Sequence, residues 1–232
     1  MVLMQAIVQG ELSGAAKLLE QSPELSRSSL AGGATRAAAK DYFCEEIAHY
    51  LYAGDTPLHA AAAGHRVEIA RHLLKLRANV GARNRRGAQP LHYAADGGPG
   101  SRQWNAAAQA ELIALLIEAG ADPNAIDKSG VAPLHRAVRQ RCARAVEALL
   151  RGGADVGMRN GSGSMPLHLA VQNTGRGGTG SEAAKSLQRE IIAILLKAGA
   201  HPEEKDERGK TAVECATSEW VREFLRQVSG RS

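Results

Sequence analysis

One tripeptide recurs along the chain at a nearly regular spacing. Pro-Leu-His is present four times, and a degenerate copy begins at Thr211; the four copies end at His59, His92, His135 and His168. Two of the three intervals between these histidines are 33 residues, and the third is 43 residues. Self-similarity at a fixed period of this length predicts a solenoid of stacked units rather than one closed core.

Two further landmarks keep the same register. A glycine lies five residues before each histidine and before Glu214, at Gly54, Gly87, Gly130, Gly163 and Gly209. An apolar pair begins 19 residues before the next histidine or Glu214, at Leu73, Leu116, Leu149 and Leu195. The longer intervals therefore contain insertions between the two helices of a unit, of ten residues in one case and thirteen in another. A further 22 residues are added before His59.

These segments resemble the ankyrin-repeat family. Residues 116–138, LIEAGADPNAIDKSGVAPLHRAV, and residues 195–216, LLKAGAHPEEKDERGKTAVECA, are similar to the helix end, hairpin and next helix start of that family, whose signature is TPLHxA. The chain departs from the family pattern at four positions: Gln89, Ala132 and Met165 replace the threonine of the signature, and Arg77 replaces the usual glycine after the second helix. The resemblance covers about residues 1–226 and implies an all-α ankyrin-repeat solenoid of about six helix-turn-helix units with β-hairpin-like loops.

We expect a single ankyrin-repeat domain over residues 1–232, with a capping unit at each end. The expected parts are a cap (1–25), an insert with an extra helix (26–53), a repeat (54–86), a repeat with an insertion (87–129), a repeat (130–162), a repeat with a glycine-rich insertion (163–208) and a cap (209–232). Trp220, Phe224 and Leu225 are expected to close the final helix pair.

The insertions are open to more than one interpretation. Phe43, Ile47, Tyr50 and Leu51 follow a helical spacing, which predicts an amphipathic helix within residues 34–52. That helix either covers the first repeats or binds a partner.

The other two insertions also leave alternatives. Trp104 either packs back on Tyr93 or the next helix, or is an exposed anchor for a partner. Residues 174–186, TGRGGTGSEAAKS, form either a flexible loop or an anion-binding loop before a helix. They lack the GKS or GKT ending of a phosphate-binding loop, which favours the flexible loop.

Composition agrees with a small-residue helical protein. Only 3% of the residues are aromatic. This favours closely stacked helices, which require many small side chains. Cys44, Cys142 and Cys215 are far apart in sequence, so neither a disulfide framework nor a CxxC zinc site is indicated. No apolar run reaches membrane-spanning length and the chain begins without a basic leader, so we expect a cytoplasmic protein.

The sequence indicates no enzymatic chemistry. The four Pro-Leu-His histidines occupy one position in successive units, roughly 10 Å apart, too far to share a zinc ion with ligands near 2 Å. We expect them to form hydrogen bonds within each hairpin. Hydrolase, metalloprotease and dinucleotide-binding motifs are absent. We therefore predict no catalytic residues, no metal and no cofactor, and a monomer.

The expected function is a protein-interaction scaffold that binds a partner in a concave groove. The resemblance implies that hairpin tips and the ends of the first helices meet the partner. At these positions, and at the second insertion, the chain has Arg85, Arg86, Ala88, Asp96, Trp104, Lys128, Ser129, Val131, Arg139, Gln140, Gly161, Ser162, Ser164, Gln172 and Asn173. The net charge of +5 favours an acidic partner.

Two other functions remain open at this point. A surface for nucleic acid or another anion is suggested by residues 83–86, RNRR, by the RGG segment of the glycine-rich insertion (176–178), and by Arg136, Arg139, Arg141 and Arg144. Aromatic stacking residues are missing from those stretches, which disfavours this interpretation. A regulatory subunit of a separate enzyme would have the same sequence features as a scaffold.

Overall fold

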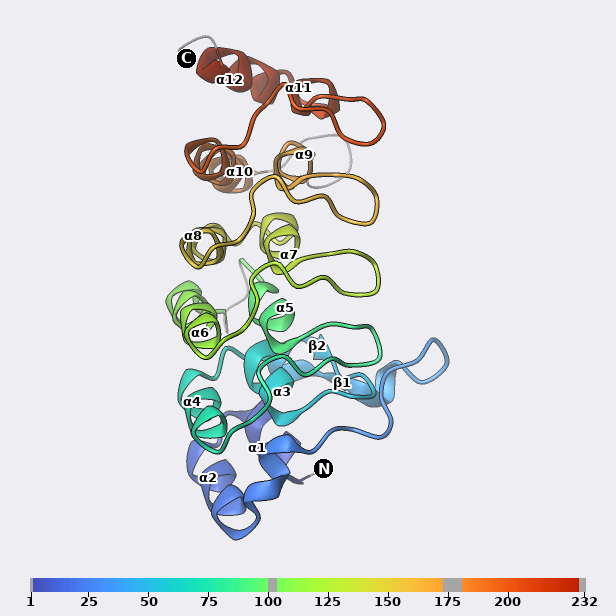
Figure 1. Cartoon of the computed structure of the whole chain (residues 1–232), viewed down its shortest axis with the longest axis vertical. Helices are drawn as coiled ribbons and strands as arrows, with labels where there is room; N and C mark the ends of the chain where they lie inside the picture. Colours follow the sequence, from blue (N-terminus) through green and yellow to red (C-terminus); the bar gives the residue numbers. More distant parts are fainter. Residues whose placement is uncertain (1, 100–103, 173–180, 230–232) are drawn as a thin grey trace.

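The computed structural model describes residues 2–99, 104–172 and 181–229. Within these ranges the chain forms six pairs of α-helices, with the first helices in one column and the second helices in the other (Figure 1). The pairs are α1 (Val2–Gln9) with α2 (Leu12–Gln21), α3 (Pro57–Ala63) with α4 (Val67–Lys75), α5 (Pro90–Ala95) with α6 (Ala106–Glu118), α7 (Pro133–Arg139) with α8 (Ala143–Arg151), α9 (Pro166–Ala170) with α10 (Glu182–Lys197), and α11 (Ala212–Cys215) with α12 (Glu219–Ser229). The expected all-α solenoid is confirmed.

Local sequence explains where the repeat helices begin and end. Proline lies in the first turn of α3, α5, α7 and α9, where no backbone donor is needed. Gly120, Gly153 and Gly199 follow the second helices with φ angles of 96°, 90° and 95°. This left-handed conformation costs other residues about 1 kcal/mol or more. Arg77 occupies the equivalent position after α4 and adopts it nevertheless, with φ of 60°.

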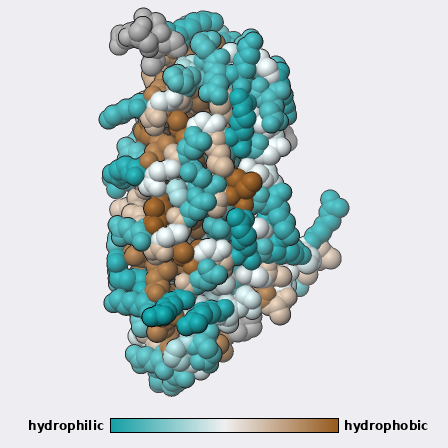
Figure 2. All heavy atoms as spheres, in the orientation of Figure 1, coloured by the Kyte–Doolittle hydropathy of each residue, from teal (hydrophilic) through white to brown (hydrophobic). Residues whose placement is uncertain are grey.

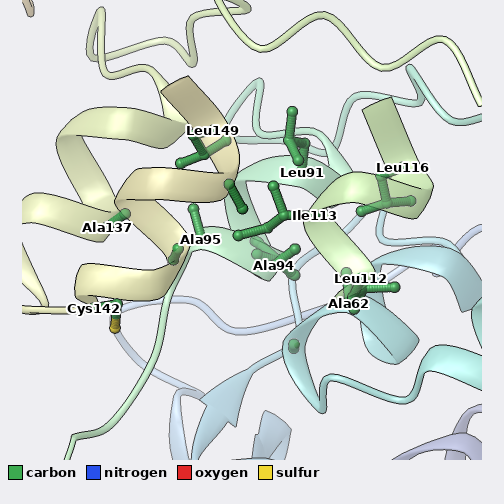
Figure 3. Packing of buried hydrophobic residues seen from close by; sticks show 14 of the residues in the cluster. Ala62, Leu91, Ala94, Ala95, Leu112, Ile113, Leu116, Ala137, Cys142 and Leu149 are labelled. Atoms are coloured by element: carbon green, nitrogen blue, oxygen red, sulfur yellow. The ribbon is translucent and has the colours of Figure 1, made fainter. Parts of the chain in front are cut away.

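The core is continuous along the stack. Leu91 of α5, Ile113 of α6 and Leu149 of α8 are fully buried and meet between the two columns (Figure 3). Ala94 and Ala95 let neighbouring first helices approach closely because their side chains are small. On the surface, Figure 2 shows a band of hydrophobic residues that runs along the stack between hydrophilic flanks. None of the helices in the described ranges is both long and apolar enough to span a bilayer.

The two ends of the stack bury apolar residues against their neighbours. Ile7 of α1 is fully buried, as are Val221 and Leu225 of α12. The guanidinium of Arg189 lies 4.8 Å from the ring centre of Trp220, an arrangement that covers this aromatic ring with a charged group.

The expected amphipathic helix within residues 34–52 is wrong. This part of the chain has two 3-10 turns, η2 (Lys40–Tyr42) and η3 (Glu45–Ile47), and two short antiparallel strands, β1 (Phe43–Cys44) and β2 (His49–Tyr50). A further 3-10 turn, η1 (Pro23–Arg27), precedes them. Phe43 pairs with Tyr50, and their rings lie 4.8 Å apart. We call residues 43–50 the insert hairpin.

Contacts with the rest of the molecule override the helical spacing of this segment. Leu51 is buried, and its carbonyl accepts a hydrogen bond from the Ala34 amide at 2.7 Å. Ile47 packs against the core, and Ala48 turns the chain with φ of 47°. A single amphipathic helix could not place all of these residues in their observed contacts. Tertiary packing of this kind outweighs the small differences in helix and strand propensity.

The Pro-Leu-His histidines connect neighbouring repeats, which corrects the expectation of hydrogen bonds within one hairpin. Nδ1 accepts from the amide three residues earlier at 3.1–3.2 Å in His59, His92 and His135. Nε2 of His59, His92 and His168 donates to a carbonyl of the following unit, at Ala88, Val131 and Lys210, whereas Nε2 of His135 donates to the Met158 carbonyl near the end of its own unit. Burial lowers the pKa of His59 and His135, and that of His92 to about 4.

Candidate functional site

The insert hairpin encloses a cavity of about 330 Å³ against the loops and first helices of the neighbouring repeats. We call it the central cavity. Seven of the residues predicted to contact a partner line it: Arg86, Ala88, Asp96, Ser129, Val131, Arg139 and Gln140. The structure thus brings together predicted residues from the loop before α5, the end of α5, the loop before α7 and the end of α7.

A buried polar network supports the hairpin from below. The Tyr93 hydroxyl donates to Asp55 Oδ2 at 3.0 Å, and Asn84 Nδ2 donates to Asp55 Oδ1 at 2.8 Å. Burial and the nearby Asp55 carboxylate raise the pKa of Tyr93, so its hydroxyl keeps its proton. The ring of His49, in the hairpin, lies on Tyr93 with 4.3 Å between ring centres. His59 meets the same tyrosine edge-on at 5.2 Å.

Arg136 joins two acidic residues at the floor of the central cavity. Its guanidinium donates to Asp96 Oδ2 and to Asp127 Oδ2, both at 2.8 Å. Burial alone would raise the pKa of Asp96, but the His49 imidazole, 3.6 Å away, and the Arg136 guanidinium outweigh burial and hold this pKa below its usual value. The pKa of Asp127 is lowered in the same way by Arg136 and two backbone amides. Asp96 therefore faces the cavity while paired with a cation that it shares with Asp127.

Arg85 and Arg86 are exposed, yet the insert holds both side chains. Arg85 Nη2 donates to the Ala34 carbonyl, and Arg86 Nη1 donates to the Tyr52 hydroxyl at 3.0 Å. The Arg86 guanidinium lies 5.0 Å from the centre of the Tyr52 ring. Neither arginine forms an ion pair within the described part of the chain.

Ala88 corrects the prediction that every hairpin position is accessible. It is fully buried, its carbonyl accepts from His59, and its amide donates to Asn84 Oδ1 at 3.0 Å. Its side chain is therefore not available to a partner, because the hairpin backbone at this point is part of the hydrogen-bonded connection between two repeats.

The predicted residues also differ in exposure along the stack. Lys128, which does not line the central cavity, is exposed in the loop before α7 beside Ser129, and the cavity-lining Arg139 and Gln140 are exposed at the end of α7. Further along the stack, Gly161, Ser162 and Gln172 are exposed and Ser164 is half-buried. Asn173 and most of the glycine-rich insertion lie outside the described residues.

Trp104 packs inward rather than standing free. It is half-buried, and its Nε1 donates to Gln109 Oε1, in α6, at 3.0 Å. It lines a second cavity of about 610 Å³ between the insert hairpin and the ends of α1, α3 and α5, which also includes Asp96 and Gln140. The contact of His49 with Asp96, at 3.6 Å, lies between the two cavities.

Sequence reasoning missed the insert's contribution to this surface. His49, Tyr50 and Tyr52 line the central cavity, but a helix was expected there. One signal was available: Tyr42, Phe43, Tyr50 and Tyr52 are aromatic, a residue type that is enriched in strands.

One group of potential metal ligands is present in the described ranges. Donor atoms of His168, Asp206 and Cys215 lie within 4.8 Å of one another. His168 Nε2 is 3.0 Å from the Lys210 carbonyl, which only accepts hydrogen bonds, so this nitrogen carries the proton. Asp206 Oδ1 accepts from the Arg208 and Lys210 amides. The group therefore repeats the histidine connection of the other units.

Several arginines of the proposed nucleic-acid surface have structural contacts instead. Arg83 donates to the carbonyls of Gly87 and Ile126. Arg141 donates to the carbonyls of Ala170 and Gln172. With Arg136 bound to two aspartates, three of these cations are engaged in connections between repeats.

Comparison with known proteins agrees with this architecture. A family model described as ankyrin repeats in many copies matches residues 46–94 and 116–170. A second model, for the single ankyrin repeat, matches residues 86–128, so that the matched segments extend over residues 46–170, more than half of the chain. The chain belongs to the ankyrin-repeat family. Ankyrin repeats are generally non-enzymatic modules of protein interaction, and the family assignment therefore indicates a protein-binding scaffold.

A curated mouse protein, ankyrin repeat and SOCS box protein 16, is similar to part of this ankyrin-repeat chain. The two are 40% identical over 95 residues, which are 40% of this chain and 20% of the mouse protein. The chain thus spans about a fifth of the length of that relative, and the similarity concerns only a segment of this size.

Proposed function

We propose that this ankyrin-repeat chain is a non-enzymatic scaffold that binds a protein partner in the central cavity. The observation that carries the proposal is that Arg86 and Arg139 reach one cavity from two different repeats, and neither has an ion-pair partner within the described residues. Tyr50 and Tyr52 line the same cavity. Tyrosine and arginine are the residue types most often found at the energetic centres of protein interfaces.

The charges around the cavity favour an acidic partner. Three arginines, Arg86, Arg136 and Arg139, line the cavity against two aspartates, and of the three only Arg136 forms an ion pair within the described residues. Acidic side chains of a partner would be attracted to this surface and would speed its encounter with the protein.

The proposal includes a cytoplasmic location, which the thiols support. Cys44, Cys142 and Cys215 are all free. Cys142 is buried, and burial raises the pKa of its thiol to about 12, so it stays protonated and unreactive. Free thiols of this kind persist in a reducing compartment, and microscopy of a fluorescent fusion tests the location.

A pair of charge-matched variants tests the binding site. Proteins that co-purify with the wild-type chain should be lost from Arg86→Ser/Arg139→Ser but retained by Arg144→Ser/Arg151→Ser, which removes the same charge from exposed positions on α8. A photoactivatable residue at Gln140 should crosslink to the partner, whereas one at Glu147 on α8 should not. Equal retention by both double variants would place the partner elsewhere.

A further inference from the structure

Three arginines surround a smaller pocket between the insert and the loop before α5. The pocket has a volume of about 270 Å³ and is lined by Ala34, Thr35, Arg36, Ala39, Tyr50, Tyr52, Arg85 and Arg86. We call it the arginine pocket. Its cationic residues come from two segments about fifty positions apart, so the fold of the insert is what brings them together.

The arginine pocket has positive charge without internal compensation. No acidic side chain lines it, and none of its three arginines forms an ion pair within the described part of the chain. Arg36 is exposed and has no hydrogen-bond partner among those residues. Like charges repel one another at this range, so a bound anion would relieve an unfavourable arrangement.

Two of the arginines are held in place before any ligand arrives. Arg85 is bound to the Ala34 carbonyl, and Arg86 is bound to the Tyr52 hydroxyl and lies over the Tyr52 ring. Each guanidinium has five N–H donors, so both keep donors for another acceptor. A cation that is already positioned loses less conformational freedom on binding, and carboxylates match its paired donors.

The size and the rim of the pocket indicate what it accepts. Its volume is below the roughly 300 to 1,000 Å³ of most small-molecule sites, so side chains fit it better than a whole metabolite. Tyr50 lines the pocket, and its ring contacts the ring of Phe43 in a tilted arrangement; the two residues are 38% and 40% exposed. Such an aromatic pair offers an apolar surface to a neighbouring residue of the same ligand.

We propose that the arginine pocket binds consecutive glutamate or aspartate side chains of an acidic peptide segment, with an adjacent apolar residue of that segment packing on Phe43 and Tyr50. The pocket adjoins the central cavity through Tyr50, Tyr52 and Arg86, which line both. The inference rests on the proposed function, because the segment would belong to the protein partner. Its test does not require that partner.

The test measures fluorescence polarisation of a short labelled peptide of glutamates with two leucines. The full chain should bind it, binding should weaken as salt is added, and the matching glutamine peptide should not bind. Arg36→Gln should weaken binding about tenfold, the effect of losing one charge-assisted contact. Arg27→Gln, which removes an exposed charge from η1 on the same insert, should leave it unchanged.

Three outcomes would overturn the inference: equal affinity of Arg36→Gln and Arg27→Gln, equal binding of the glutamine peptide, or binding of a phosphoserine peptide when the glutamate peptide fails. Arg86→Lys keeps the charge but loses the paired donors, so it should also weaken binding. Arg139→Ser separates the two proposals. It should reduce binding of the full partner and spare the glutamate peptide, because Arg139 lines only the central cavity.

Discussion

The two halves of the solenoid use the same repeat differently. Beneath the insert, the residue after the repeat histidine is Tyr93 or Arg136, and both contribute polar contacts that support the cavity. In the next repeat the same position is Leu169, and Gly161 and Ser162 in the preceding loop are exposed. One inserted segment has therefore converted an open repeat surface into an enclosed one, and Tyr93 and Arg136 under it form side-chain contacts that a leucine at the same position cannot form.

Acid should destabilise the repeats beneath the insert more strongly than the later repeats. The pKa of His92 is about 4 in the folded chain and about 6.5 when unfolded, so its neutral form stabilises the fold fully above pH 6.5. That contribution, about 3 kcal/mol, is lost progressively as the pH falls from 6.5 to 4. His59 and His135 act in the same direction. Urea denaturation at pH 7, 5.5 and 4.5 measures the loss, and His92→Gln should flatten part of it.

Replacing Tyr93, beneath the insert, with leucine, the residue at the equivalent position of the later repeat, should loosen the packing of the insert hairpin on the repeats. Tyr93→Leu removes the ring beneath His49 and the hydroxyl that donates to Asp55, so we expect a loss of about 3 kcal/mol in the free energy of unfolding. Amides of the insert hairpin should exchange faster with deuterium than those of α10. Tyr93→Phe keeps the ring and should cost about 2 kcal/mol. If Tyr93→Leu lowers the free energy of unfolding no more than Tyr93→Phe does, the contact between the Tyr93 and His49 rings does not hold the insert hairpin in place.

Charge at the enclosed surface should set the rate of partner association. Changing Arg85, Arg86 and Arg139 together to serine should slow association about tenfold and remove most of its salt dependence, with little change in the melting temperature. Surface plasmon resonance at two salt concentrations measures both effects. Serine at Arg27, Arg144 and Arg151, which removes the same charge from exposed positions outside the central cavity, serves as the control, and an equal effect there would mean that only net charge matters.

The smallest expected effects on stability concern two residues with left-handed backbone conformations. Arg77→Gly should stabilise the whole chain by about 0.5 to 1 kcal/mol, because φ of 60° is strained for arginine. Ala48→Gly, at φ of 47°, should increase protection of the insert hairpin from deuterium exchange and leave the melting temperature almost unchanged. A rise in melting temperature in the Ala48 variant would show that the insert unfolds together with the repeats.

Much of the candidate surface could be inferred from repeat position alone, because equivalent positions recur with a constant geometry. This is why Arg86, Arg139 and Gln140 meet at one cavity as expected from the register. Position did not reveal that Ala88 is buried or that Asp96 is paired, since both depend on contacts with other repeats. Nor did it reveal Tyr50 and Tyr52, which belong to a segment outside the repeat.

The sequence by itself determined the helix pairs, their order and the positions of the insertions. Proline at a helix start and glycine after a helix end act on the backbone within a few residues, so the local sequence of each unit sets its own helix boundaries. Only the tertiary structure decided the shape of the insert and therefore of the cavity. His49 reaches Asp96, and Ala34 reaches Arg85, across about fifty positions of sequence. Contacts at that separation depend on how the units stack, and local periodicity contains no information about them.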